Sequence, residues 1–250
     1  MGFEVAADAY GRFMGRYSFP LGVEFADRAG LAPGQRALDV GCGTGALTTV
    51  LVERLGAESV VGVDPSSSFV EAIRARLPEV DVRQAPAERL PFPDDSFDVT
   101  LAQLVVHFMT DPVAGLREMG RVTRAGGLIG ACVWDHAGGR SPLSSFWQAA
   151  RSLDPAAPGE SELPGVREGH LAELFTAAGL RDVESGVLTV QAEFADFEDW
   201  WEPFTFGVGP LGDYVAGLDS RQVAALRERC AAVFTPRVTA SAWVVTGRAA

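Results

Sequence analysis

Short apolar segments alternate with segments of helical spacing over much of the chain, and this alternation limits the possible folds more than any other feature. The apolar segments predict strands at residues 36–40, 58–63, 80–84, 97–104 and 128–134. Helical spacing separates them at 45–55, 66–77 and 112–123, and the serines after Pro65 are expected to cap the second of these helices. Strands that alternate with helices predict crossover units, hence a parallel sheet with helices on both faces.

The second half of the chain follows this pattern less closely. Residues 125–127 (Ala-Gly-Gly) are predicted to form a turn, 167–178 a helix that ends at Gly179, and 182–192 and 240–247 two final strands. The segments 136–165 and 194–238 are aromatic-rich and too long to be ordinary connections. We expect a single domain over residues 1–250, in which both segments are lid insertions over the carboxyl edge of the sheet.

A glycine-rich loop follows the first predicted strand, with Gly41, Gly43 and Gly45 at alternate positions and Cys42 between the first two. Glycine permits a tight turn and lets the backbone approach a ligand closely. Asp64 ends the second predicted strand, where a carboxylate is suited to accept hydrogen bonds from a ribose diol. The two features meet at the carboxyl edge of the sheet and predict a ribose-bearing cofactor, although the glycine spacing alone leaves a nicotinamide cofactor open.

Composition excludes several classes of function. The formal net charge is −12, which argues against a nucleic-acid partner. All 21 basic residues are arginines, so no lysine is available as a Schiff base, general base or phosphate-loop residue. No apolar stretch is long enough for a membrane span, and the first residues lack the pattern of a secretory signal, so we expect a cytoplasmic protein. The three cysteines have no metal-ligand spacing, and no metal site is predicted.

Four successive motifs carry a family resemblance: "LDVGCGTG", "VVGVDPS", "AERLPFPDDSFDV" and "LREMGRVTRAGG". In this order and spacing, over about residues 36–134, the chain resembles class I S-adenosylmethionine-dependent methyltransferases. The similar group is the one related to ubiquinone and menaquinone biosynthesis, with a methyltransferase type 11 core, and the start "YGRFMGRYS" is similar to the opening of one of its subgroups. The resemblance implies a Rossmann-like, doubly wound seven-stranded sheet of order 3-2-1-4-5-7-6, with the last strand antiparallel.

The same resemblance implies positions for the cofactor, S-adenosyl-L-methionine. Backbone at Gly41, Cys42 and Gly43 would line its methionine part, with no thiol chemistry expected of Cys42, and Asp64 would hold the ribose hydroxyls. Pro65 would lie beside the adenine, and Ala87 and Glu88 would face the adenine edge. Gln103 and Leu104 would pass close to the methyl-donor end, while Tyr10 and Arg16 would close over the site, with Arg16 a partner for the cofactor carboxylate. Pro86 departs from the family, which usually has an aspartate there, so another group must bind the adenine amine.

The implied reaction is methyl transfer to an O, N or C atom of a small, largely apolar molecule. A general base is needed only where the nucleophile must lose a proton. His107, after the fourth strand, and His136, just past the fifth, are the candidate catalytic residues; packing under the lid is the alternative for both. A cofactor-binding protein without catalysis and, as a weaker alternative, an NAD(P)-dependent oxidoreductase remain open. We expect a monomer or a homodimer.

Overall fold

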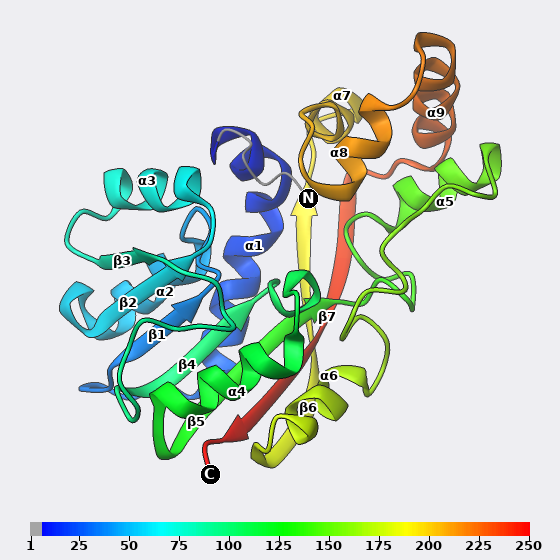
Figure 1. The fold of residues 1–250 in the computed structure, drawn as a ribbon. Helices are drawn as coiled ribbons and strands as arrows, with labels where there is room; N and C mark the ends of the chain where they lie inside the picture. The colour runs from blue at the N-terminus through cyan, green and yellow to red at the C-terminus, as the bar shows by residue number, and fades with distance from the viewer. Residues whose placement is uncertain (1–6) are drawn as a thin grey trace.

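The computed structural model describes residues 7–250, apart from the side chains of Ala7 and Asp8. The strands within residues 7–250 form a sheet of order β3-β2-β1-β4-β5-β7-β6 (Figure 1). The strands are β1 Ala37–Val40, β2 Val60–Asp64, β3 Asp81–Gln84, β4 Phe97–Gln103, β5 Thr123–Trp134, β6 Arg181–Glu193 and β7 Arg237–Arg248. Strands β1 to β5 pair in parallel, and β7 is antiparallel to both of its neighbours. The predicted fold class and strand order are confirmed.

Helices cover both faces of the sheet. Apolar side chains of α1 (Ala7–Ala29), α2 (Ala46–Leu55) and α3 (Ser67–Arg76) pack in one core with inward residues such as Leu101. Those of α4 (Pro112–Val122) and α6 (His170–Ala177) pack in a second core with Leu38 and Val40. Successive side chains of a strand point to opposite faces, so neighbours in β1 and β4 enter different cores. This explains why the central strands read as continuous apolar segments.

Local signals place the helix starts where the sequence predicts them. The Ser66 hydroxyl accepts a hydrogen bond from the backbone N–H of Phe69 at the start of α3, as expected of a cap. The Asp111 carboxylate does the same for Ala114 at the start of α4, where Pro112 takes the first helical position. Helix α3 therefore begins directly after β2, whereas α4 begins after a connection that follows β4 and contains a short 3₁₀ helix at Val106–Phe108.

Two local features differ from the expectations. The N-terminal helix α1 has no counterpart in the predicted elements, because its two early glycines and Pro20 weaken the local helical signal; its stability comes from packing, since Leu21 and Phe25 are fully buried. The turn predicted at residues 125–127 is wrong. Those residues lie inside β5, where Gly126 has a φ of 73° and the pairing with β4 shifts register between Phe97 and Val99.

The segments 136–165 and 194–238 gather beside one end of β6 and β7, close to the N-terminal end of α1 (Figure 1). They contain α5 (Ser144–Leu153), α7 (Phe197–Trp201), α8 (Gly209–Ala216) and α9 (Ser220–Val233). Short 3₁₀ helices complete the fold: η1 (Ala57–Ser59), η2 (Val106–Phe108) and η3 (Glu202–Thr205). Rings from α1 and η3 meet at Phe13 and Phe204, whose centroids are 5.9 Å apart, so these segments pack directly on the sheet domain.

Candidate functional site

The glycine loop after β1 adopts a backbone that only glycine accommodates easily. Gly41, Gly43 and Gly45 have φ values of 70°, 52° and 83°. The backbone N–H groups of Gly41 and Cys42 both donate to the Val63 carbonyl, at 2.8 and 2.9 Å, which ties the loop to the end of β2. A Cβ on Gly41 would lie 2.3 Å from Val105, whereas one on Gly43 would meet nothing within 4 Å. Gly43 is therefore the point where the loop backbone faces open space.

Asp64 links the end of β2 to this loop. Its Oδ2 accepts the Gly43 N–H at 2.9 Å, and its Oδ1 accepts the Ser66 N–H at 2.9 Å. The side chain is buried, and burial raises the pKa of the carboxyl, although the two backbone N–H groups lower it. Asp64 thus fixes the loop and keeps carboxylate lone pairs at the carboxyl edge of the sheet.

The side chain of Cys42 points back toward β2, since a Cβ on Gly62 would lie 3.1 Å from its sulfur. The residue is buried, and burial raises the pKa of the thiol well above its ordinary value. Only the backbone of Cys42 is free to take part in the site. This placement agrees with the expectation that Cys42 contributes no thiol chemistry.

A polar cavity lies between the glycine loop and α1. Its lining includes Tyr10, Ser18, Asp39, Gly41, Cys42, Gly43, Gln103 and Leu104. The Gln103 amide donates to the Ser18 carbonyl at 2.9 Å, but Gln103 Oε1 and the Ser18 hydroxyl are buried and have no hydrogen-bond partner among the described residues. Buried polar atoms without partners are rare, so this cavity has unused capacity to bind a polar ligand.

Asp39 contributes a buried acid to the same cavity. Its Oδ2 accepts the Thr48 hydroxyl at 2.6 Å, and the residue is 1% exposed. Burial raises its pKa to about 7; the Thr48 hydrogen bond opposes the shift, and the charge of Asp64 adds to it. Asp39 therefore takes up or releases a proton near neutral pH.

This raised pKa predicts a pH-dependent stability. The folded state keeps the Asp39 proton up to about pH 7, whereas the unfolded chain releases it near pH 3.8. The stabilisation from this group is complete below about pH 4 and is lost as the pH rises through about 7. Across that window, we expect the free energy of unfolding of the wild type to fall relative to that of Asp39→Asn by on the order of a few kcal/mol. Urea unfolding of both proteins measures the change. A constant difference at all pH values would contradict the buried, protonated state.

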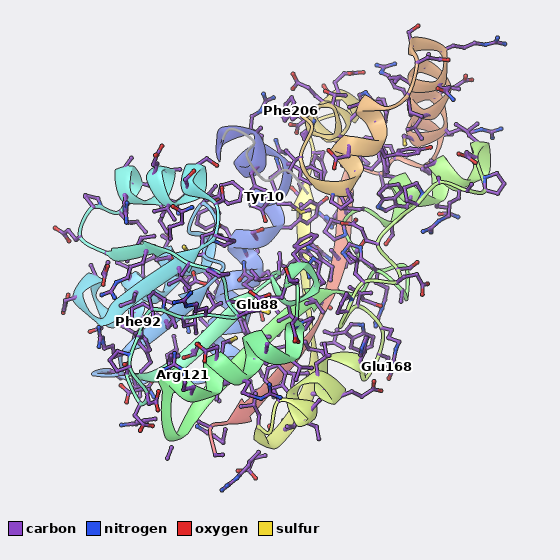
Figure 2. All side chains as sticks on the ribbon, viewed as in Figure 1. Tyr10, Glu88, Phe92, Arg121, Glu168 and Phe206 are labelled. Atoms are coloured by element: carbon purple, nitrogen blue, oxygen red, sulfur yellow. The ribbon has the colours of Figure 1, made fainter. Side chains whose placement is uncertain are left out.

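A second, less polar cavity lies on the other side of Gly41. Its lining includes Pro65, Pro86, Ala87, Glu88 and Val105. Glu88, labelled in Figure 2, accepts the backbone N–H groups of Thr110 and Asp111 with Oε1, at 2.8 and 3.2 Å. The predicted adenine-side residues are thus brought together, with Glu88 joining the loop after β3 to the loop after η2.

An apolar chamber lies beyond the polar cavity, and Tyr10 and Leu104 line both. Leu104 has a φ of 60°, a strained conformation for a branched side chain, and such strain is typical of functional positions. Tyr10 lies at the end of α1 that faces α3, against the ring of Phe69 (Figure 2). Burial raises the pKa of the Tyr10 phenol to about 12, with help from the charge of Asp64. The two cavities therefore share a wall at these two residues.

Both candidate histidines line the chamber. Their ring centroids are 6.0 Å apart. Burial lowers the pKa of His107 well below 6.5, and the neighbouring His136 lowers it further. Burial also lowers the pKa of His136 to about 4, although the charge of Asp135 opposes that shift. Both rings are therefore neutral at pH 7, and the lowered pKa values make them weak bases. Their catalytic role stays a prediction.

Comparison with known proteins identifies the family. A family model described as "Methyltransferase domain" matches residues 38–131. An uncharacterized protein of Mycobacterium tuberculosis is 30% identical over 205 residues, which cover 78% of this chain and 74% of that protein. The chain belongs to the methyltransferase-domain family. The resemblance carried by the four motifs is thereby confirmed.

This methyltransferase-family chain has two further similarities, one in part of its sequence and one in its fold. An uncharacterized methyltransferase of Mycobacterium tuberculosis is 40% identical over 135 residues, which cover 54% of the chain, and the match spans about half (52%) of that relative's length. The fold is similar to a phospholethanolamine N-methyltransferase 2 of Haemonchus contortus, solved with phosphomonomethylethanolamine and S-adenosylhomocysteine. There the TM-score is 0.60 at 16% identity, with 96% of this chain and 57% of that one covered.

Arg16 does not reach the polar cavity of this methyltransferase-family chain. Its guanidinium binds the Asp199 carboxylate at 2.5 and 2.8 Å and the Glu193 carbonyl at 2.9 Å, and it lies over the Phe194 ring. It joins α1 to the segment that contains α7. Its predicted contact with a cofactor carboxylate would require these bonds to break.

Sequence reasoning missed Ser18, Asp39 and Glu160 as members of the site. Asp39 had a usable signal, because an acidic residue inside an otherwise apolar strand is costly to bury without a role. Ser18 and Glu160 had none, since they reach the site only through the packing of α1 and of the segment 136–165. Across residues 7–250, no cluster of three or more potential metal ligands is found, and no helix is long and apolar enough to cross a membrane.

Proposed function

We propose that this methyltransferase-family chain transfers a methyl group from S-adenosyl-L-methionine to an O, N or C atom of a small, largely apolar molecule. One observation carries the proposal. A polar cavity beside the glycine loop and an apolar chamber share Tyr10 and Leu104 as a common wall. A polar donor molecule in the first would meet an apolar acceptor in the second at that wall.

The residues of the polar cavity suit the amino-acid end of the proposed cofactor. Asp39, Gln103 Oε1 and the Ser18 hydroxyl are acceptors for an ammonium group, and two of these atoms are unpartnered. Helix α2 starts beside them with no side-chain cap, so its first N–H groups are available to a carboxylate. Asp64 would hold the ribose hydroxyls, and the cavity of Pro65, Pro86 and Ala87 would take the adenine.

The cofactor would supply a methyl group on a sulfonium, whose leaving group is already activated. The chain then has mainly to align the acceptor and exclude water. Leu104, Phe13 and Trp134 give the chamber apolar walls, and His107 and His136, the candidate catalytic residues, would face the acceptor there as neutral rings. The family names of the relatives and the S-adenosylhomocysteine bound to the structural neighbour support this proposal.

Replacing Asp64 with alanine should weaken binding of S-adenosylmethionine by about 10- to 100-fold. The substitution removes the carboxylate proposed to bind the ribose and also the acceptor of the Gly43 N–H, and hydrogen bonds to a charged group contribute about 1.5–3 kcal/mol. Isothermal titration calorimetry measures the change. The matched control is Asp81→Ala on the exposed edge strand β3, which should bind like the wild type.

Three outcomes of binding and turnover measurements would redirect the proposal. No binding of S-adenosylmethionine by the wild type would reject it, and binding of NADH instead would favour the oxidoreductase alternative. Binding without turnover to S-adenosylhomocysteine across a panel of phenols, amines and quinone precursors would favour a non-catalytic binding protein.

We also propose that residues 1–250 form one domain, in which 136–165 and 194–238 act as a lid. The support is that α1 holds the second segment through Arg16–Asp199 and Arg12–Glu202, while Val208–Leu211 form part of the chamber lining. Exposed ion pairs of this kind stabilise little, typically below about 1 kcal/mol, so they suit a contact that opens and closes.

A further inference from the structure

Within the described part of the chain, three polar atoms of chamber-lining side chains have no hydrogen-bond partner. His107 Nδ1 and Trp134 Nε1 are buried, and no described residue bonds to either. The third is Oε1 of Glu160, because the bond that the structure gives this carboxyl, from Trp147 Nε1 at 3.1 Å, goes to Oε2. All three side chains line the chamber, whose other walls are mainly apolar. The chamber therefore has polar capacity that the protein itself leaves unused.

One hydrogen bond holds Glu160 at the chamber wall. Trp147 on α5 donates to Oε2, and the neutral ring of His136, just after β5, has its Nδ1 3.8 Å from the same oxygen. The side chains of His136 and Glu160 are each 4% exposed. A carboxyl buried this deeply beside uncharged rings is costly, and such groups are most often found at functional sites.

We propose that Glu160 and Trp134 bind the hydroxyl group of a neutral aromatic acceptor, a phenol, and that Glu160 takes its proton. The proposal rests on the proposed function and specifies its substrate class. The phenol O–H would donate to Oε1 of Glu160, and the phenol oxygen would accept from the Trp134 N–H. In the proton transfer, the O–H bond breaks, its electron pair stays on the oxygen, and the proton forms a bond to Glu160.

A hydroxyl fits these atoms better than a charged group does. A protonated amine has donors only, so the Trp134 N–H would stay unpartnered and buried. A carboxylate or phosphate would meet Glu160 and no arginine, because none lines the chamber. A hydroxyl both donates and accepts, and the rings of Phe13, Phe108 and Trp134 suit a flat apolar body.

The surroundings of Glu160 favour proton uptake near neutral pH. Burial raises the pKa of Glu160 to about 7, although the hydrogen bond from Trp147 opposes the shift. This pKa is closer to that of a phenol than the pKa of an ordinary glutamate is. The other titratable groups at this chamber are His136, His107, Tyr10 and, behind His136, Asp135. The two histidines are neutral and Tyr10 keeps its proton, so among the described residues of the chamber lining Glu160 is the acid–base group with a pKa near 7.

The chamber must widen to admit a ring. Its free volume is about 40 Å³, whereas a cavity of about 150 Å³ is known to hold benzene. Val208–Leu211 form the wall contributed by the segment 194–238, between Gly207 and Gly212, and Gly207 and Gly209 have φ values of 72° and 61°. Admission of a ring therefore requires part of the lining, such as this wall, to move.

The test is calorimetric binding of 2-naphthol, naphthalene and protonated 2-naphthylmethylamine to the full chain with S-adenosylhomocysteine present. Wild type should bind 2-naphthol at least tenfold more tightly than the other two. Glu160→Gln, which keeps an acceptor for Trp147, should weaken 2-naphthol binding about tenfold and leave naphthalene binding unchanged. Trp134→Phe should weaken 2-naphthol binding about fivefold, and Glu162→Gln, an exposed neighbour, should have no effect.

Other results would overturn the inference. If both variants keep the wild-type preference for 2-naphthol, Glu160 and Trp134 do not bind the hydroxyl. Tighter binding of the amine would make the chamber a cation site. Titration of the same proteins with S-adenosylmethionine, in the absence of S-adenosylhomocysteine, separates this inference from the proposed function. Normal cofactor binding with an unchanged preference rejects only the acceptor assignment, whereas no cofactor binding rejects the function.

Discussion

Replacing Gly43 with alanine is expected to reduce the affinity for S-adenosylmethionine at least tenfold while lowering the free energy of unfolding by only about 1–2 kcal/mol. The added methyl group would meet no protein atom within 4 Å, so it would project into the space proposed for the ligand. The φ of 52° makes alanine less favourable there by about 1–2 kcal/mol. Calorimetry gives the affinity, and chemical unfolding gives the stability.

The matched variant is Gly41→Ala, two residues earlier in the same loop. Its φ of 70° carries a similar strain, but its Cβ would also lie 2.3 Å from Val105. Overpacking costs about 1–3 kcal/mol in addition, so Gly41→Ala should be clearly less stable than Gly43→Ala. Wild-type affinity in Gly43→Ala would show that the loop backbone does not approach the cofactor.

The central half of the fold was predictable because its signals are local. Strands buried on both faces, such as 37–40 and 60–64, are apolar apart from one aspartate each, and Ser66 caps the helix that follows the second of them. Glycines in the left-handed region mark the loop after β1, since other residues are strained there. The order of the strands, however, followed only from the family resemblance. The alternation of strands and helices along the sequence does not determine which strands lie next to each other in the sheet.

The acceptor side of the site depends on contacts that local pattern does not contain. Glu160 follows a stretch rich in proline and glycine, and nothing in its neighbours predicts that Trp147 will bury it. Arg16 illustrates the same limit, because its partner Asp199 lies 183 residues away. The sequence pattern also did not predict helix α1. Burial of its apolar side chains against the sheet stabilises the helix more than its glycines and Pro20 destabilise it.

Replacing Phe146 with alanine should lower the free energy of unfolding by about 3–5 kcal/mol. Phe146 on α5 is fully buried, and its ring lies 5.2 Å from that of Phe204 and 6.4 Å from those of Trp201 and Tyr214. It therefore joins the segment 136–165 to the segment 194–238. Urea unfolding measures the loss, and Phe19→Ala at an exposed site should change stability by no more than about 0.5 kcal/mol.

The shape of the transition tests whether the proposed lid folds with the sheet. Tryptophan fluorescence is weighted toward the lid segments, which contain Trp147, Trp200 and Trp201, whereas far-ultraviolet circular dichroism reports the whole fold. In a single cooperative domain, both signals change together, and Phe146→Ala shifts both equally. If Phe146→Ala moves the fluorescence transition alone, the lid unfolds separately and residues 1–250 are not one cooperative unit. The chamber wall at Val208–Leu211 would then open by local unfolding rather than by a hinge.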